Sequence, residues 1–175
     1  MAFTEPIQSK SHQQVQRYLG VDPGLRRTGY AIIERNPRGP ILREAGVIRS
    51  TAELSLAQRV YEIGQGIRDV IEDFAPQVMS IEQVFSLGRN PKSALLMAHA
   101  RGAILMAAAE QSVSVVHFPP THVKKLLTGS GKASKEQMQF AIQNELRIDV
   151  VPEPHDVADA AAIALCIYHS LRRVE

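Results

Sequence analysis

Residues 17–35, RYLGVDPGLRRTGYAIIER, decide the fold of this chain because they hold two short apolar runs on either side of a turn. Arg17–Asp22 ends at an aspartate followed by Pro-Gly, which predicts a strand that stops there. Gly29–Arg35 predicts a second strand, and Ile41–Arg49 predicts a third after a turn at Pro37–Pro40. Connections this short join antiparallel neighbours. The sequence therefore opens with a three-stranded antiparallel meander.

A helix and a further strand follow the meander. Apolar residues that recur three and four positions apart predict a helix over Glu53–Phe74, with Ser50 and Glu53 forming a capping box at its start. Val78–Glu82 predicts a buried strand that ends on a carboxylate. A crossover through a helix joins parallel neighbours, so this strand begins the parallel part of the sheet.

The remaining segments are mostly helical. Pro91–Gln111 predicts an Ala-rich helix, and Val113–Phe118 predicts a fifth strand. Short helices begin near Thr121 and Ser134, and a last helix is predicted over Asp156–Leu171. The order of the elements indicates an α/β fold with a five-stranded mixed sheet, three antiparallel strands and then two parallel ones, flanked by helices.

Length and composition are those of one globular domain. We expect a flexible N-terminal arm over residues 1–16 and a single domain over residues 17–175. The polar N-terminus lacks the apolar core of a signal peptide, and no apolar run approaches the roughly 18 residues that a membrane span needs. Cys166 is the only cysteine, which excludes a disulfide framework and a cysteine-ligated metal site. These features predict a cytoplasmic protein.

Charge is distributed unevenly along the chain, although the net charge is only +2. Residues 1–85 hold ten basic and ten acidic residues, and residues 136–175 hold three basic and seven acidic ones. The middle segment, residues 86–135, holds one acid and seven basic residues: Arg89, Lys92, Arg101, Lys124, Lys125, Lys132 and Lys135. A basic segment beside an acidic one indicates a polyanion site next to carboxylates with another task. An accidental imbalance on a solvated surface is the alternative explanation.

Four acids stand where the predicted fold gathers side chains at one end of the sheet. Asp22 ends the first strand, and Glu82 ends the fourth. Asp156 and Asp159 lie three apart in the first turn of the last helix, so they point to one face. Hard carboxylate oxygens from separate elements suit Mg²⁺ or Mn²⁺. Two such ions about 4 Å apart can hydrolyse a phosphodiester.

Each acid also has a purely structural explanation. Asp156 and Asp159 suit the start of a helix, where a carboxylate caps backbone N–H groups and complements the dipole. Glu82 fits a surface acid at a strand end, and Asp22 in Asp-Pro-Gly fits a turn former. The four together are harder to explain in this way than any one of them.

Four stretches of the chain resemble the RuvC family of Holliday-junction resolvases. They are LGVDPGLRRTGYAIIE (residues 19–34), SIEQVF (80–85), ARGAI (100–104) and HDVADAAAIAL (155–165). The resemblance runs from about Arg17 to His169, in the family's order and spacing. Single stretches are weak signals, and the combination is highly specific.

The resemblance implies an RNase H-like fold and an obligate two-fold homodimer. It implies an endonuclease of DNA recombination and repair that makes paired, symmetric nicks in four-way DNA junctions, leaves 5′-phosphate and 3′-hydroxyl ends, and works with a branch-migration motor. It also implies hydrolysis that depends on Mg²⁺ or Mn²⁺, with two ions in each active site. Carried over by motif, Asp22, Glu82, Asp156 and Asp159 are its catalytic metal ligands.

Six residues are candidate DNA contacts: Phe85, Arg89, Lys92, Lys124, Lys132 and Lys135. The resemblance makes Phe85 the aromatic that stacks on a base at the opened crossover, and it matches Lys124 and Lys135 to basic positions. Unanchored aromatics in polar loops are good stacking platforms, although a buried loop anchor is the alternative for Phe85. Lys132 and Lys135 flank a Gly/Ser-rich loop that a phosphate backbone could order, and ordinary surface lysines are the alternative.

His155 is ambiguous because some family members carry a histidine in place of the first aspartate of the last helix. Here an aspartate, Asp156, already stands at that spacing, and His155 precedes it. A role beside the acids and a solvent-facing position before the helix are equally consistent with the sequence.

Three other functions compete with the junction endonuclease. Asp-x-Gly followed by Thr28-Gly29 is similar to the phosphate loop of the actin and sugar-kinase superfamily, but those proteins clasp a nucleotide between two such domains. A non-catalytic junction-binding module needs no acid cluster. A related RNase H-like nuclease that acts on RNA is disfavoured by Phe85 and by the long match through the last helix.

Overall fold

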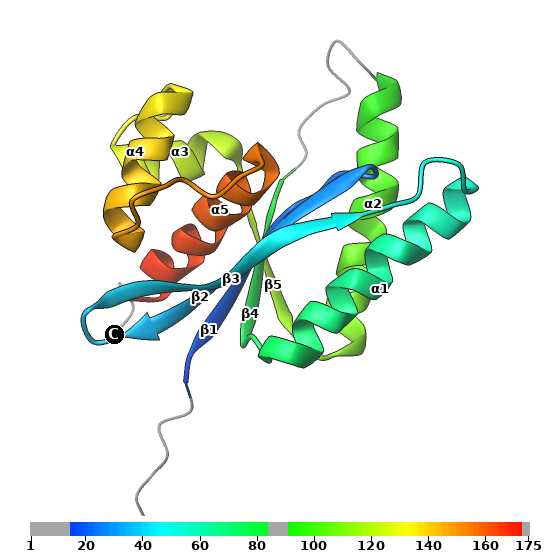
Figure 1. The fold of residues 1–175 in the computed structure, drawn as a ribbon, viewed down its shortest axis with the longest axis horizontal. Helices are drawn as coiled ribbons and strands as arrows, with labels where there is room; N and C mark the ends of the chain where they lie inside the picture. The colour runs from blue at the N-terminus through cyan, green and yellow to red at the C-terminus, as the bar shows by residue number, and fades with distance from the viewer. Residues whose placement is uncertain (1–14, 84–90, 173–175) are drawn as a thin grey trace, which may run out of the picture.

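The computed structural model describes residues 15–83 and 91–172, and these form a mixed five-stranded sheet with helices on both faces (Figure 1). The strands lie in the order β3-β2-β1-β4-β5. Their bounds are β1 Arg17–Asp22, β2 Arg27–Asn36, β3 Gly39–Arg49, β4 Val78–Glu82 and β5 Ser114–Phe118. The pairs β1–β2 and β2–β3 are antiparallel, and β1–β4 and β4–β5 are parallel. The predicted sheet, three antiparallel strands and then two parallel ones, is confirmed.

Five helices cover the sheet: α1 Leu56–Phe74, α2 Pro91–Glu110, α3 Pro120–Thr128, α4 Lys135–Leu146 and α5 His155–Arg172. α1 and α2 lie on one face, and α5 lies on the other with α3 and α4 outside it (Figure 1). Within the described residues, no helix is both long and apolar enough to cross a bilayer.

The start of α1 differs from the prediction. The helix begins at Leu56, and its capping box consists of Ser55 and Gln58 rather than Ser50 and Glu53. Ser50 is instead buried and donates a hydrogen bond of 2.5 Å to the backbone oxygen of Leu25. Both serines are followed three residues later by Glu or Gln, and the tertiary contact of Ser50 removes it from competition for the cap. The predicted capping box of α4, Ser134 with Gln137, is confirmed.

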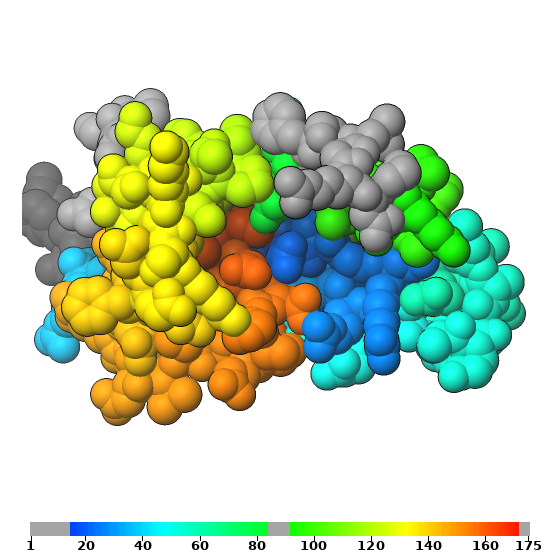
Figure 2. Space-filling model, turned by 90° about the horizontal axis from the view of Figure 1, so that it is seen from above, coloured from blue at the N-terminus to red at the C-terminus, as the bar shows by residue number. Residues whose placement is uncertain are grey.

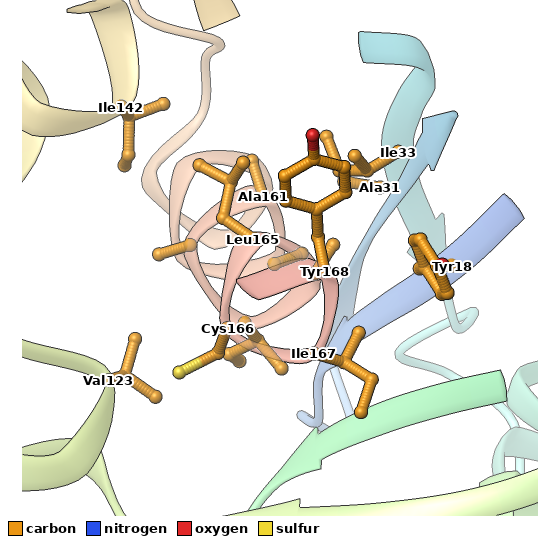
Figure 3. Close-up of a cluster of buried hydrophobic side chains, with 14 of the residues drawn as sticks. Tyr18, Ala31, Ile33, Val123, Ile142, Ala161, Leu165, Cys166, Ile167 and Tyr168 are labelled. Atoms are coloured by element: carbon orange, nitrogen blue, oxygen red, sulfur yellow. The ribbon is translucent and has the colours of Figure 1, made fainter. Parts of the chain in front are cut away.

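Alternation along β1 divides the core between the two faces of the sheet. Tyr18 packs with α5, and Leu19 and Val21 pack with α1 and α2. Figure 3 shows the α5 side, where Tyr168 and Leu165 lie among side chains from β1, β2 and α4. Cys166 is part of this cluster, as predicted, and burial raises the pKa of its thiol to about 12.

Two glycines let α5 lie directly on the sheet. A Cβ atom at Gly20 in β1 would overlap the backbone oxygen of Ala160, and one at Gly29 in β2 would overlap that of Asp156. The buried hydroxyl of Ser80 in β4 also donates a hydrogen bond of 2.9 Å to the backbone oxygen of Ile163. These contacts set the position of α5, and with it the position of the helix's first turn, relative to β1, β2 and β4.

Candidate active site

The sheet brings Asp22 and Glu82 to the same edge. β1 and β4 are parallel neighbours, and their last paired residues are Val21 and Ile81. Asp22 and Glu82 follow these residues directly, so two adjacent strands end on carboxylates at the same level. Both acids are half-buried.

The N-terminal part of α5 supplies the other two acids. The contact at Gly29 places the backbone of Asp156 against β2, next to the end of β1. Asp156 is half-buried, and Asp159, one turn further along α5, is exposed. All four predicted acids therefore lie at one end of the sheet.

The pKa shifts of three of the acids agree with their close grouping. The pKa of Asp22 is raised to about 8, mainly by desolvation and then by the charges of Asp159, Glu82 and Asp156. Desolvation and the charge of Asp159 raise the pKa of Glu82. Desolvation and the charge of Asp156 raise the pKa of Asp159. Like charges this close disfavour one another's ionised forms.

The acid cluster fits a divalent cation, although its side chains do not converge on one point. Within residues 15–83 and 91–172, no three His, Cys, Asp or Glu side chains form a ready-made metal site. Oδ2 of Asp156 is nevertheless buried and accepts no hydrogen bond, and it forms an ion pair with Nε of Arg27 at 3.2 Å. Crowded carboxylates with raised pKa values and an unbonded oxygen are the donor set that hard cations such as Mg²⁺ and Mn²⁺ bind.

A cavity of about 430 Å³ adjoins the acids, and its lining combines both signs of charge. Glu82 and Asp159 lie on its acidic side, and Lys124 of α3, Lys135 of α4 and His155 of α5 also line it. Lys124 lowers the pKa values of both acids, which opposes the effects of desolvation and of like charge. Figure 2 shows this face, where the start of α5 in orange lies between α4 in yellow and the β1–β2 connection in blue.

His155 lies at the rim of this cavity as the first residue of α5, and its Nε2 contacts Nζ of Lys135. Both His155 and Lys135 lower the pKa of Asp159. His155 is thus exposed yet part of the charged surroundings of the acids, which combines the two positions that the sequence left open.

The other predicted DNA contacts are less closely tied to the acids. Lys92 is exposed in the first turn of α2, and Lys132 is exposed in the loop before α4. Neither of them lines the cavity. Phe85 and Arg89 lie outside the described residues.

Arg101 of α2 is a neighbour of the acids that the sequence did not single out. Its Nη1 donates a hydrogen bond of 2.8 Å to the backbone oxygen of Glu82, and its Nη2 lies 2.6 Å from Nδ1 of His117 in β5. Nδ1 must accept this bond, because a guanidinium has only donors. In agreement, desolvation and the charge of Arg101 lower the pKa of His117. The sequence signal was the ARGAI stretch, which contains Arg101 but does not reveal its contact.

Comparisons with known proteins agree with this geometry. The family model described as crossover junction endodeoxyribonuclease RuvC matches residues 18–167. A protein of that name from Rhodopirellula baltica is 50% identical over 148 residues, which are 85% of this chain and 83% of that protein. Another from Hydrogenovibrio crunogenus is 42% identical over 153 residues, 87% of each chain.

A solved structure extends the likeness to three dimensions. The structure of Thermus thermophilus RuvC in complex with Holliday junction substrate superposes with a TM-score of 0.85 and 29% identity, covering 91% of this chain and 96% of that one. The RNase H-like fold expected from the sequence is confirmed.

Proposed function

This chain belongs to the RuvC family of crossover junction endodeoxyribonucleases, and from that premise we propose that it cleaves four-way DNA junctions at a site built from Asp22, Glu82, Asp156 and Asp159. The observation that carries the proposal is the arrangement of the acids: the ends of β1 and β4 and the start of α5 bring all four to one end of the sheet, beside a cavity with lysines on its wall. Family membership favours this activity over the nucleotide-binding, scaffolding and RNA-cleaving alternatives.

The four acids would hold two Mg²⁺ or Mn²⁺ ions, as carboxylates from separate elements do in other phosphodiester hydrolases. Bound ions of this kind activate a water and offset the charge that develops on the phosphate. The chain's own contribution is to fix the carboxylates on two strand ends and one helix. Hydrolysis would leave a 5′-phosphate and a 3′-hydroxyl.

Basic and aromatic side chains around the acids would hold the DNA. Lys124 and Lys135 line the cavity and are placed to contact the phosphates next to the scissile bond. Lys92 and Lys132, which are exposed, would contact the backbone further out. Arg89, which lies outside the described residues, is a further candidate contact because it belongs to the same basic segment. Phe85 would stack on a base at the opened crossover.

We also propose that the protein acts as a two-fold homodimer through the outer face of α1 and α2. Large apolar side chains are exposed there, with Tyr61 at 64% and Met106 at 52%. A cavity of about 430 Å³ between the two helices is lined by both of these residues, and a Cβ atom at Gly102 would meet no atom within 4 Å. Exposed apolar patches of this kind mark protein interfaces, and dimer symmetry that matches junction symmetry explains paired nicks.

The resemblance further supports a cytoplasmic location and cooperation with a branch-migration motor. Both would place the protein where four-way junctions are processed during recombination and repair.

The test uses a synthetic end-labelled four-way junction and a matched linear duplex. Wild-type protein and Asp22→Asn are incubated with each DNA in Mg²⁺, Mn²⁺ or EDTA, and the strands are resolved on a denaturing gel. We expect paired nicks at symmetric positions in the junction only, which are absent in EDTA and in Asp22→Asn, while Asp22→Asn still binds the junction. Tight junction binding without nicks in either metal would contradict the proposal.

A further inference from the structure

A second group of basic side chains lies on the other side of the acids from Lys124 and Lys135. Arg26 lies in the connection between β1 and β2, Arg27 begins β2, and Arg49 ends β3. All three are exposed. They belong to the first half of the chain, whose neutral overall charge conceals them in the sequence.

Register places two of these arginines directly opposite each other. Arg27 pairs with Arg49 across the antiparallel strands β2 and β3. Gly29 of β2 contacts α5, and Ala45 of β3 packs against the α5 cluster. Side chains alternate along a strand, so Arg27 and Arg49 project from the same face of the sheet as α5.

Opposed like charges are unfavourable in the free protein. Directly opposite like charges on neighbouring strands destabilise a sheet. Arg27 has a carboxylate within 3.2 Å, Oδ2 of Asp156, but neither Arg26 nor Arg49 has an ion pair within the described residues 15–83 and 91–172. A site of this kind suits an anion from outside the chain, and the planar guanidinium matches a phosphate in particular.

The arginines lie beside the acids. Arg27 contacts Asp156, so the acids lie between the arginines on one side and the lysines of α3 and α4 on the other. In Figure 2 the β1–β2 connection, in blue, borders the start of α5 on the side away from α4. A nucleic-acid strand that enters the acid cluster past Lys124 and Lys135 would leave it over the arginines.

We propose that Arg26, Arg27 and Arg49 form a second phosphate-binding surface, which holds the backbone of a DNA arm on the β2–β3 side of the acids. This inference rests on the proposed function, since it assigns a further part of the same substrate. The surface binds the backbone rather than bases, so its contribution is independent of sequence and weakens with salt.

The test replaces Arg26 and Arg49 together with glutamine and leaves Arg27, the partner of Asp156, in place. Binding to the four-way junction is measured in EDTA over a salt series of about 50 to 300 mM. We expect the double variant to bind at least about fivefold more weakly at the lowest salt. The slope of log K against log salt should become shallower by about 2, because two phosphate contacts are lost.

Two further variants separate this surface from general charge and from folding. Arg38→Gln removes an exposed arginine in the turn at the opposite end of the β2–β3 hairpin, and it should leave the affinity and the slope unchanged. Arg26→Lys/Arg49→Lys keeps the charges and should keep the slope. The melting temperature of the glutamine variant should equal or exceed that of the wild type, because a repulsive pair has been relieved.

The outcomes distinguish this inference from the proposed function. If the wild type binds the junction and the glutamine variant binds it with the same affinity and slope, the second surface does not exist. An equal loss in Arg38→Gln would also overturn it, because the effect would be one of net charge alone. A wild-type protein that binds no junction would overturn the proposed function itself.

Discussion

Burial and the other acids of the site disfavour the ionised form of the Asp22 carboxyl group. Its pKa is raised to about 8 by desolvation and by the charges of Asp159, Glu82 and Asp156. A folded-state pKa above the unfolded one means that the folded protein binds the extra proton, so the stability from this group is complete below pH 4. It is lost as the pH rises towards 8.

We therefore predict that, in EDTA, the wild-type protein loses stability between pH 5 and pH 8, by roughly 1 kcal/mol per pH unit at the steepest point. Asp22→Asn should flatten this dependence and melt at a higher temperature at pH 8. Thermal denaturation across the pH range measures both effects. Asp149→Asn, an exposed acid in the loop before α5, is the control and should behave as the wild type does. A wild-type profile that rises towards pH 8 would contradict the electrostatic account.

A bound divalent cation should reverse this loss. At pH 8 we expect Mg²⁺ or Mn²⁺ to raise the melting temperature of the wild type in a concentration-dependent way, because a ligand that binds only the folded state stabilises it. Asp22→Asn should show a much smaller rise. Equal rises in the two proteins would place the metal elsewhere.

Arg101 acts on the site through the backbone of Glu82, which it contacts at 2.8 Å. We predict that Arg101→Gln lowers the cleavage rate about tenfold or more and raises the metal concentration that gives half-maximal activity, since partners behind metal ligands typically matter at this level. Arg101→Lys should restore part of both effects. Junction affinity in EDTA should change little, and a loss of affinity equal to the loss of rate would assign Arg101 to DNA binding instead.

At the scale of whole helices and strands, some features of the fold could be predicted from the sequence and others could not. β1 and β4 have the predicted bounds because each is a short apolar run closed by an acid, and the positions of Asp22 and Glu82 follow from those bounds. The cap of α1 was wrong because two serines offer the same local pattern, and a tertiary contact of Ser50 decides between them. The contacts of Arg27 and Arg101 join residues that are distant along the chain, so no local pattern reveals them.

The close contact of α5 with the sheet at Gly29 leads to a prediction about this helix. Gly29→Ala would place a methyl group on the backbone oxygen of Asp156, so the first turn of α5 must move. We expect a loss of about 1–3 kcal/mol in stability and a much larger proportional loss of cleavage. Gly64→Ala in α1, where the new Cβ would meet Ala103 at an ordinary 3.4 Å, is the control for the stability measurement. Denaturant unfolding measures the loss of stability, and the junction assay measures the loss of cleavage. A Gly29→Ala protein with wild-type cleavage would show that Gly29 does not set the position of the acids on α5.

At the scale of the whole molecule, the proposed homodimer implies that paired cleavage requires two copies of the chain. We predict that Tyr61→Glu with Met106→Glu, on the outer face of α1 and α2, yields monomers in analytical ultracentrifugation and reduces paired nicking to single nicks or none. Phe140→Glu is the matched control, because Phe140 is 66% exposed on α4, away from that face. Dimers that survive the double substitution would place the interface elsewhere.

α5 carries two of the four acids and is also buried along its length from Ala160 to Tyr168. Its middle amide hydrogens should exchange with solvent only when much of the molecule opens. Two of the four acids thus lie at the start of a helix whose buried middle we expect to exchange slowly, whereas Lys124 and Lys135 lie on α3 and α4. Random substitutions in the core should accordingly yield many proteins that still fold and bind junctions but have lost the alignment needed to cut them.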